Sequence, residues 1–258
     1  MTISSDINDF LKKYFDKVLV VTIPRLTERH QSIKQNLAGL DFEFFFGTDK
    51  LELDFENSKT DGTYDEIKTK KLQRQGKELN HGELACSLTH RQVYAAMIKN
   101  NWKKVLIFED DAIPLFENLP LIPETVIELP KEWELIYLGY LKHEKVTAAL
   151  KQKQVFYKIA SALGLLKWSY KMVSNLLPKP YSKHLKKAGF HDCTHAYAVT
   201  FTAAQKLLAA QTPVVYRADD LLSSTIMKGE LEAFITVPKF FDQEIFYNQS
   251  IASEIKEK

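Results

Sequence analysis

An apolar run that ends in three carboxylates constrains the fold of this chain more than any other stretch. Residues 105–108 read VLIF, and residues 109–111, which follow directly, read EDD. A short continuous apolar run predicts a strand that is buried on both faces, as in a parallel sheet. Three adjacent carboxylates repel one another, which favours a cation or cationic partner at this point. Since ligands of open α/β sheets bind outside the carboxyl ends of the strands, we expect a binding site here. The alternative is a solvated acidic turn, which Pro114 would also suit.

The rest of the chain alternates between stretches typical of strands and stretches typical of helices. A capping box is predicted at Asn80, because Glu83 follows it by three positions. Residues 51–79 are polar and lack a clear period, so we expect a long surface excursion there. The alternation predicts an α/β fold with a mainly parallel central sheet, formed by residues 1–258 as a single domain. The predicted strands are 17–23, 42–46, 133–138, 195–201 and 231–237, and the predicted helices are 25–40, 80–100 and 202–211.

Composition is that of a globular protein without a membrane span. Hydrophobic residues make up 45% of the chain and charged residues 26%, which are ordinary values. The acidic N-terminus does not have the pattern of a secretory signal, and no run approaches the roughly 20 apolar residues of a membrane-spanning helix. Cys86 and Cys193 match no metal-binding spacing and suggest no disulfide framework. We therefore expect a cytoplasmic protein.

Charge is distributed unevenly along the chain. Residues 142–190 contain eleven lysines and one acid, Glu144, so this segment carries +10 and the remainder −8 of a net +2. We interpret the segment as a basic helical insertion that faces an anionic partner, and we expect no nucleic acid. Its residues 155–177 place an apolar face between lysines, which predicts a helix on the anionic inner surface of the cytoplasmic membrane. A helix packed between two parts of the protein is the alternative, because Leu165, Trp168 and Met172 lie on the opposite face. The predicted apolar face consists of Val155, Phe156, Ile159, Ala162, Leu163, Leu166, Tyr170, Val173 and Leu177.

The acidic run suits a divalent cation. Glu109 and Asp111 alternate along an extended chain and so point the same way, with Asp110 on the other side. Mg²⁺ and Mn²⁺ favour carboxylate oxygens and retain open positions for the phosphates of a substrate. Such a metal would neutralise the charge of a departing nucleotide diphosphate.

Two further groups of side chains are candidates for chemistry. Glu83, Ser87 and His90 fall on one helix face and could orient a sugar or phosphate, although Glu83 alone fits a cap and His90 alone fits a packed histidine. Either Asp219 or Asp220 could serve as a general base for an acceptor hydroxyl. Asp219 could instead be the N-cap of a helix over residues 221–227.

These pieces, in this order, resemble glycosyltransferase family 25, the lipooligosaccharide galactosyl- and glucosyltransferases. The resemblance covers residues 17–222 and depends most on residues 82–90 (GELACSLTH) and 105–111 (VLIFEDD). Residues 18–29, 133–139 and 195–200 and the pair Asp219 and Leu222 also fit. The resemblance implies a GT-A-like nucleotide-sugar-binding fold, a divalent metal at an acidic motif and inversion at the sugar carbon.

Carried over by position, the resemblance assigns roles to eleven residues. It implies a metal at Glu109 and Asp111, and catalytic roles for Glu83, His90, Asp219 and Asp220. The donor nucleotide would lie near the N-terminal motif and the acidic run. Two features depart from the family: Ala218 precedes a doubled aspartate where a hydrophobic residue usually precedes one, and the insertion 142–190 is outside the motif set. The residues implied to bind the cofactor are Thr22, Arg25, Arg29, Glu109, Asp110 and His195.

The sequence therefore predicts a metal-dependent inverting glycosyltransferase that uses Mn²⁺ or Mg²⁺. It would move galactose or glucose from UDP-galactose or UDP-glucose to a lipid-linked oligosaccharide. A metal-dependent phosphohydrolase is an alternative, but its Asp-x-Asp motif would need an acid at position 112, which is alanine. A non-catalytic membrane-surface adaptor is the alternative from another class.

Overall fold

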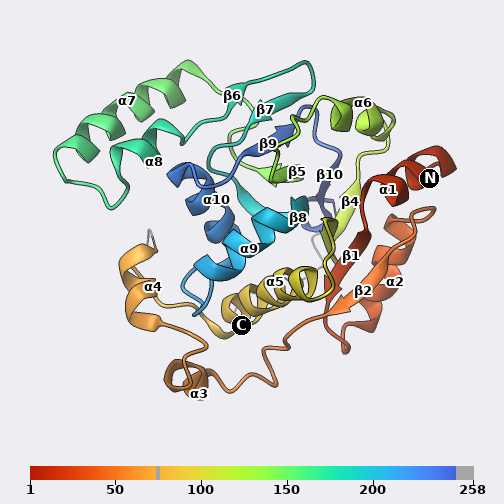
Figure 1. Ribbon diagram of the computed structural model, residues 1–258, viewed down its shortest axis with the longest axis horizontal. Coiled ribbons are helices and arrows are strands. Elements are labelled where there is room, and N and C mark those ends of the chain that lie inside the picture. The colour runs from red at the N-terminus through yellow and green to blue at the C-terminus, as the bar shows by residue number, and fades with distance from the viewer. Residues whose placement is uncertain (74–75, 248–258) are drawn as a thin grey trace.

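The computed structural model describes residues 1–73 and 76–247, and within them an eight-stranded mixed sheet forms the centre (Figure 1). In this described part, β8 and β7 run against the other six strands, so most of the sheet is parallel in direction. The prediction of an α/β fold with a mainly parallel sheet is confirmed at this level. The strand order is β2 (Glu43–Phe46), β1 (Lys17–Thr22), β3 (Lys104–Glu109), β8 (Asp192–Thr200), β5 (Leu135–Leu141), β9 (Ala233–Thr236), β7 (Leu185–Lys187) and β6 (Lys179–Pro180).

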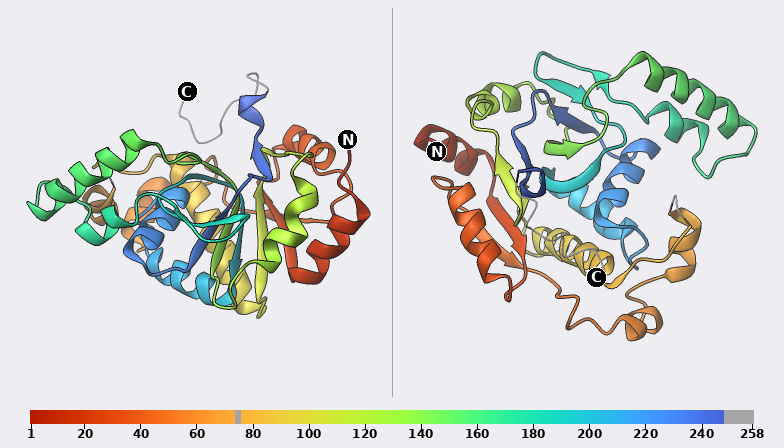
Figure 2. Two further views of the ribbon diagram at one scale, coloured as in Figure 1. Left: turned by 90° about the horizontal axis from the view of Figure 1, so that it is seen from above. Right: turned by 180° about the vertical axis from the view of Figure 1, so that it is seen from behind.

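Successive residues of the buried strands face two different cores, as the period of two in a strand requires. Val20 and Phe108 pack in one core, and Val21 and Ile107 pack in the other. Helices cover both faces of the sheet, so the chain forms three layers (Figure 2). The helices over the first face are α1 (Ser5–Tyr14), α2 (Thr27–Asn36) and α6 (Ile122–Ile127), and those over the second are α5 (His81–Lys99), α9 (Phe201–Ala210) and α10 (Ala218–Lys228).

The long helix α5 begins at the predicted capping box. The side chain of Asn80 accepts a hydrogen bond from the Glu83 amide at 2.8 Å, and the Glu83 carboxylate accepts one from the Asn80 amide at 3.0 Å. These bonds satisfy two of the otherwise unpaired donors at the N-terminus of the helix. The predicted helix over residues 80–100 is therefore confirmed.

The acidic run does not continue β3. That strand ends at Glu109, Asp110 and Asp111 form a turn, and β4 (Ala112–Pro114) then pairs with β10 (Phe241–Gln243). The prediction that Glu109 and Asp111 alternate on an extended chain is wrong, because Asp110 and Asp111 form a turn. The turn instead directs three consecutive carboxylates toward one pocket.

The excursion before α5 is more regular than its sequence suggested. It contains α3 (Phe55–Thr60) and α4 (Glu66–Leu72), whose N-caps are the side chains of Asp54 and Asp65. Tyr64 is buried between them and pairs with Val214 in an isolated bridge. This buried anchor ties the excursion to the body of the protein. Two short 3₁₀ helices are also present, η1 (Leu119–Leu121) and η2 (Glu244–Phe246).

The basic segment 142–190 forms α7 (Ala148–Ala162), α8 (Tyr170–Ser174) and the β6–β7 hairpin at one margin of the sheet (Figure 1). The prediction of one helix over residues 155–177 is wrong. Gly164 takes a left-handed backbone conformation (φ 73°) just after α7, which ends the helix. Within the described residues, no helix has both the length and the apolar character needed to cross a bilayer.

Candidate active site

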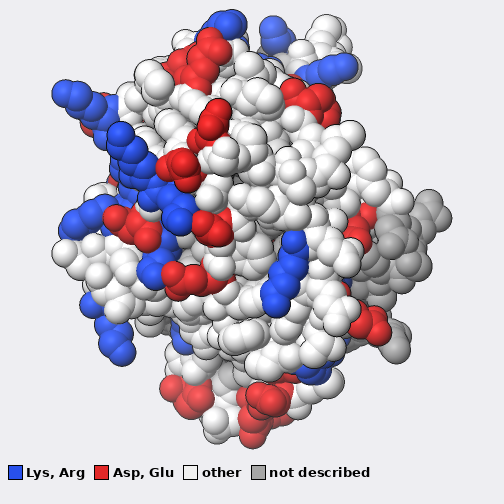
Figure 3. All heavy atoms as spheres, turned by 90° about the vertical axis from the view of Figure 1, so that its right-hand side faces the viewer, with Lys and Arg blue, Asp and Glu red and all other residues white. Residues whose placement is uncertain are grey.

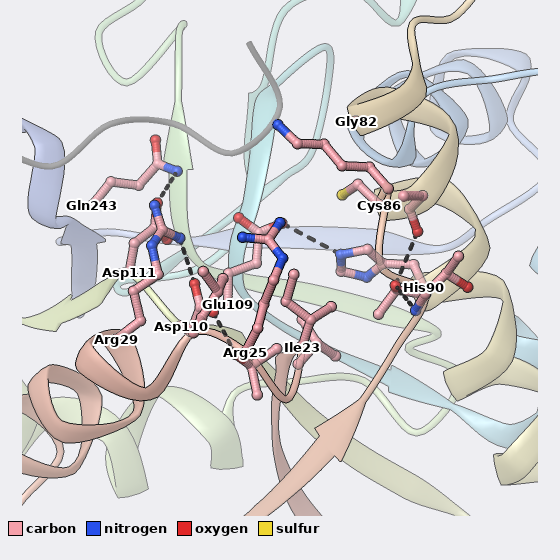
Figure 4. Close-up of a pocket in the computed structure, with 17 residues that line it drawn as sticks. Ile23, Arg25, Arg29, Gly82, Cys86, His90, Glu109, Asp110, Asp111 and Gln243 are labelled. Carbon is pink, nitrogen blue, oxygen red and sulfur yellow. Dashed lines mark hydrogen bonds and ion pairs between the residues drawn. The ribbon is translucent and has the colours of Figure 1, made fainter. Parts of the chain in front are cut away.

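A pocket opens at the carboxyl ends of the parallel strands β1 and β3 (Figure 4). Its walls include Thr22 at the end of β1, the acidic turn after β3, and Gly82 and Cys86 in the first turns of α5. The empty space amounts to about 790 Å³ when the open mouth is included. The pocket lies where an open α/β sheet is expected to bind its ligand.

Asp110 is held from two sides at the floor of the pocket. The Thr22 hydroxyl donates to one carboxylate oxygen at 2.6 Å, and Arg29 Nη1 donates to the other at 2.6 Å. Only 6% of Asp110 is exposed. A charge-assisted bond to Arg29 compensates its negative charge, so Asp110 links the acidic turn to the N-terminal strand and helix α2.

One buried oxygen of Asp111 has no hydrogen-bond partner among the described residues. Its Oδ2 accepts a 3.3 Å hydrogen bond from Gln243 Nε2, whereas its buried Oδ1 has no hydrogen-bond partner in the described part of the chain. Burial, together with the neighbouring carboxylates of Glu109 and Asp110, raises the pKa of Asp111 to about 8. An orphaned buried oxygen beside two further carboxylates is an arrangement that a divalent cation would complete.

Glu109 belongs to a buried chain of polar groups. His90 Nε2 lies 3.3 Å from Glu109 Oε1, and His90 Nδ1 lies 2.7 Å from the Tyr197 hydroxyl. Thr194 donates a further hydrogen bond to the same oxygen of Glu109 at 2.5 Å. Burial alone would raise the pKa of Glu109, but the bonds from His90 and Thr194 outweigh it and lower the pKa. Glu109 is therefore fixed in position and held as a carboxylate.

Cationic side chains line the same pocket. Arg25 donates from Nε and Nη2 to Asp49 at 2.6 and 3.2 Å, in the two-bonded geometry that fixes a guanidinium. Although burial acts to raise the pKa of Asp49, the bonds from Arg25 and the Leu51 amide lower it. Lys50 is a further lining residue. In Figure 4, Arg25 and Arg29 lie beside the acidic turn, with Cys86 and His90 on the α5 side.

Asp219 and Asp220 lie in the first turn of α10, outside the lining of this pocket. The N-cap is Arg217, so the alternative in which Asp219 caps a helix is wrong. Arg217 Nε donates to Asp220 at 2.8 Å, whereas Asp219 accepts bonds from two backbone amides, that of Asp220 at 2.8 Å and that of Cys193 at 3.3 Å. Burial and the charge of Asp220 raise the pKa of Asp219 to about 6.

Cys193 connects the two acidic clusters. After burial, the largest influences that raise its thiol pKa are the charges of Glu109 and Asp219. Its backbone has φ 71°, which is unusual for a residue other than glycine, and its amide is the donor to Asp219. Adjacent residues of β8 therefore bond both acidic groups, because the Cys193 amide donates to Asp219 and the Thr194 hydroxyl donates to Glu109.

Other predicted residues lie away from the pocket. Glu83 serves the capping box, with Arg217 Nη1 at 3.7 Å, and Ser87 donates to the Tyr216 carbonyl. His195 is fully buried, and burial lowers its pKa to about 4. Its ring packs so closely on Gly139 that a Cβ there would lie 2.3 Å from His195 Nε2.

The structure thus brings together seven of the predicted residues and adds four that sequence reasoning missed. Two of the missed residues lie shortly after β2, namely Lys50, which lines the pocket, and Asp49, which holds Arg25, so the rule that ligands bind at strand ends could have identified them. Cys86 lies within the helix motif, and no sequence signal points to Gln243. The seven predicted residues that line the pocket are Thr22, Arg25, Arg29, His90, Glu109, Asp110 and Asp111.

This chain is similar to a known protein family and to individual proteins of that family. A family model described as glycosyltransferase family 25 (LPS biosynthesis protein) matches residues 15–222. A Bos taurus protein named probable inactive glycosyltransferase 25 family member 3 is 27% identical over 207 residues, which is 78% of this chain and 30% of that protein. Its Homo sapiens counterpart, named inactive, is 29% identical over 53% of this chain and 19% of its own length.

A third relative has a name that states an activity. Procollagen galactosyltransferase 2 of Mus musculus is 29% identical over 137 residues, which is 51% of this chain and 17% of that protein. The chain spans less than a third of the length of each of these three curated relatives. The match to the family model includes β1, α5 and the acidic turn, which together form most of the pocket.

Proposed function

This chain belongs to glycosyltransferase family 25, and from that premise we propose that it transfers galactose or glucose from UDP-galactose or UDP-glucose to a hydroxyl group. The transfer would invert the configuration at the sugar carbon. The single observation that carries the proposal is the acidic turn, which shares one pocket with Arg25, Arg29 and Lys50 at the carboxyl ends of β1 and β3.

The charges of the pocket suit a nucleotide diphosphate better than a neutral ligand. Arg25 and Arg29 are each held by a carboxylate, so their guanidinium groups are preoriented before any ligand binds. A diphosphate alone would be repelled by three carboxylates, and a divalent cation alone would be repelled by the arginines. A cation and a diphosphate together satisfy both sets, which is the reason to propose a metal-dependent donor site.

Glu109 and Asp111 would hold Mn²⁺ or Mg²⁺, with Asp110 beside them. The fit is supported by the unpaired buried oxygen of Asp111 and by the oxygen-only character of these donors. When bound, the cation would neutralise the diphosphate as it departs from the sugar. Asp110 would hold Arg29 in place, and His90 would fix the orientation of Glu109.

Asp219 is the better candidate for the general base. Its partly buried carboxyl accepts bonds from backbone amides, including that of Cys193, while Asp220 is engaged by the charged side chain of Arg217. With a pKa of about 6, Asp219 is ionised at neutral pH and still basic enough to accept a proton from an acceptor hydroxyl. Asp220 would raise that pKa and stabilise the first turn of α10.

We propose a lipid-linked oligosaccharide at the cytoplasmic face of a membrane as the acceptor. The lipopolysaccharide biosynthesis named in the family description supports this class. The name of the Mus musculus relative favours a protein hydroxyl as the second candidate. Both acceptors would present a hydroxyl to the same base, so a panel containing each would separate them.

A non-catalytic role is the competing function, because two of the relatives are named as inactive. The test is release of UDP from UDP-galactose and UDP-glucose, with and without Mn²⁺, by the full chain. Asp111→Asn should lower metal-dependent release at least a hundredfold, and Asp9→Asn, at an exposed position on α1, should not. Absence of release and of transfer to either acceptor by the unaltered chain would favour the non-catalytic role.

A further inference from the structure

Helix α7 carries an apolar stripe that faces away from the protein. Val155, Phe156, Ile159 and the C-cap residue Leu163 are 57%, 66%, 57% and 69% exposed. At 100° per residue these four positions fall within about one third of the helix circumference. A monomeric protein rarely exposes large apolar side chains in such a group, so the stripe points to a partner.

The opposite face of α7 is already packed. Leu150 and Tyr157 contact the small core that contains Leu176 and Leu177, and Ala160 is 8% exposed. Gln154 Nε2 also donates to the Val173 carbonyl of α8 at 2.8 Å. These contacts fix the rotation of α7, so the exposed stripe cannot turn inward without loss of this core.

Lysines border the stripe on both sides. By the same helical geometry, Lys151 and Lys158 lie along one edge and Lys153 lies beyond the other. None of these three forms an ion pair with a carboxylate in the described part of the chain, and Glu144 is the sole acid of residues 142–190. The surroundings of the stripe therefore carry uncompensated positive charge.

The position of α7 leaves this surface open. The helix lies at the outer margin of the molecule in Figure 1 and projects from one end in Figure 2. The face on the other side of the molecule, seen in Figure 3, carries basic and acidic side chains intermixed. That face therefore differs in its charge pattern from residues 142–190, which contain eleven lysines and one acid.

We propose that α7 docks on an anionic lipid bilayer. Val155, Phe156, Ile159 and Leu163 enter the boundary between headgroups and acyl chains, while the bordering lysines contact lipid phosphates. A bilayer fits both features of the helix, because lysines at the edge of an inserted stripe extend their aliphatic stems along it and keep their charges at the headgroups. An apolar protein groove would match the stripe alone and leave the lysines without a partner.

Vesicle co-sedimentation of the full chain tests the proposal. Vesicles of phosphatidylcholine with phosphatidylglycerol should bind the protein, and vesicles of phosphatidylcholine alone should bind it weakly. Binding should fall steeply in about 1 M salt, where the Debye length is about 3 Å. No nucleotide sugar is present, so the outcome is independent of the proposed transferase activity.

Two sets of variants separate the apolar and the electrostatic contributions. Phe156→Ser with Ile159→Ser should weaken binding at least about tenfold, because two exposed apolar side chains are removed. The matched control is Ile127→Ser on α6, whose side chain is 78% exposed, and it should bind as the unaltered chain does.

Substitution of Lys151, Lys153 and Lys158 by Gln should weaken binding about a hundredfold, at about fivefold per lysine. The same substitution at Lys13, Lys99 and Lys131 is the control for net charge and should have a smaller effect. Thermal unfolding and UDP release without vesicles should be unchanged in the α7 variants, since α7 contributes no residue to the pocket.

Three results would overturn the proposal. The first is absence of binding to anionic vesicles at low salt, and the second is equal weakening by the α7 and control sets. The third is a dimer, detected by light scattering, that becomes a monomer on Phe156→Ser, because the stripe would then be covered by a second copy of the chain.

Discussion

Replacement of Asp111 by Asn should stabilise the metal-free protein, even though it should remove the proposed metal-dependent activity. The carboxyl is held at a pKa of about 8, with burial the largest cause and Glu109 and Asp110 the next, against a value of 3.8 in an unfolded chain. A carboxyl whose folded pKa is raised carries no penalty below the unfolded pKa, because it is protonated in both states. Between the two pKa values, the unfolded state ionises more readily, and the folded state loses stability.

The size of the effect follows from the same two values. Each pH unit between about 4 and 8 adds about 1.4 kcal/mol to the penalty, which reaches about 4 kcal/mol at pH 7 as an upper bound. At pH 5 the penalty is about 1.6 kcal/mol by the same relation. The stabilisation by Asp111→Asn should therefore grow by as much as about 3 kcal/mol from pH 5 to pH 7 and level off above pH 8.

Urea unfolding in the presence of a chelator, at pH 5, 7 and 8.5, measures this difference. Asp9→Asn is the matched control, because Asp9 is exposed on α1, and its difference from the unaltered chain should not change with pH in this way. Added Mn²⁺ should narrow the difference by stabilising the unaltered chain alone, by about 2.7 kcal/mol at a hundred times its dissociation constant. A metal-free Asp111→Asn variant that is less stable than the unaltered chain at pH 7 would refute the reasoning.

Three further changes test other parts of the structure. Asp219→Asn should lower the rate of transfer 10²- to 10⁴-fold. Asp220→Asn should shift the acid limb of the pH–rate profile below pH 6, because it removes a charge that raises the pKa of Asp219. An unchanged profile for Asp220→Asn would argue against Asp219 as the base. Asn80→Ala should lower the free energy of unfolding by about 1 kcal/mol through loss of the cap of α5, and a loss below a few tenths in urea unfolding would contradict the capping role. Gly139→Ala should destabilise strongly, since its Cβ would lie 2.3 Å from His195 Nε2 and 2.7 Å from a backbone carbonyl oxygen; wild-type stability would contradict this packing.

Local signals predicted the elements that build the pocket. The apolar run before Glu109 forms the buried part of β3, and its alternate side chains pack in the two cores on either side of the sheet. Asn80 and Glu83 predicted the start of α5 because the capping box depends only on residues three apart. Glu109 and His90 are on adjacent predicted elements and do meet in the structure.

The remaining features depend on contacts between distant parts of the chain. Gln243 reaches Asp111 across 132 residues, and no local pattern encodes that pair. The reversed direction of β8 is likewise set by its neighbours in the sheet, because strand composition does not distinguish the two directions. The helix predicted over residues 155–177 is wrong for a local reason, because Gly164 interrupts an apolar pattern that otherwise continues.

The roles predicted for individual site residues remain proposals, and only some of these residues line the pocket. Thr22, Arg25 and Arg29 line it, whereas Glu83 and His195 have packing and capping contacts of their own. The sequence grouped these residues because each has a polar or ionisable side chain within a motif of the family. The structure separates them by position: even on α5, His90 lines the pocket while Glu83 caps the helix.

Isothermal titration calorimetry of UDP-galactose and UDP-glucose into the full chain, with and without Mn²⁺, measures the central claim directly. We predict that at least one of the two nucleotide sugars binds with Mn²⁺ present and binds far more weakly when a chelator removes the metal. In Asp111→Asn, Mn²⁺ should no longer increase the affinity for that nucleotide sugar. Equal affinity with and without the metal, or an unchanged increment in Asp111→Asn, would contradict the assignment of the acidic turn as the site that joins a cation to a sugar donor.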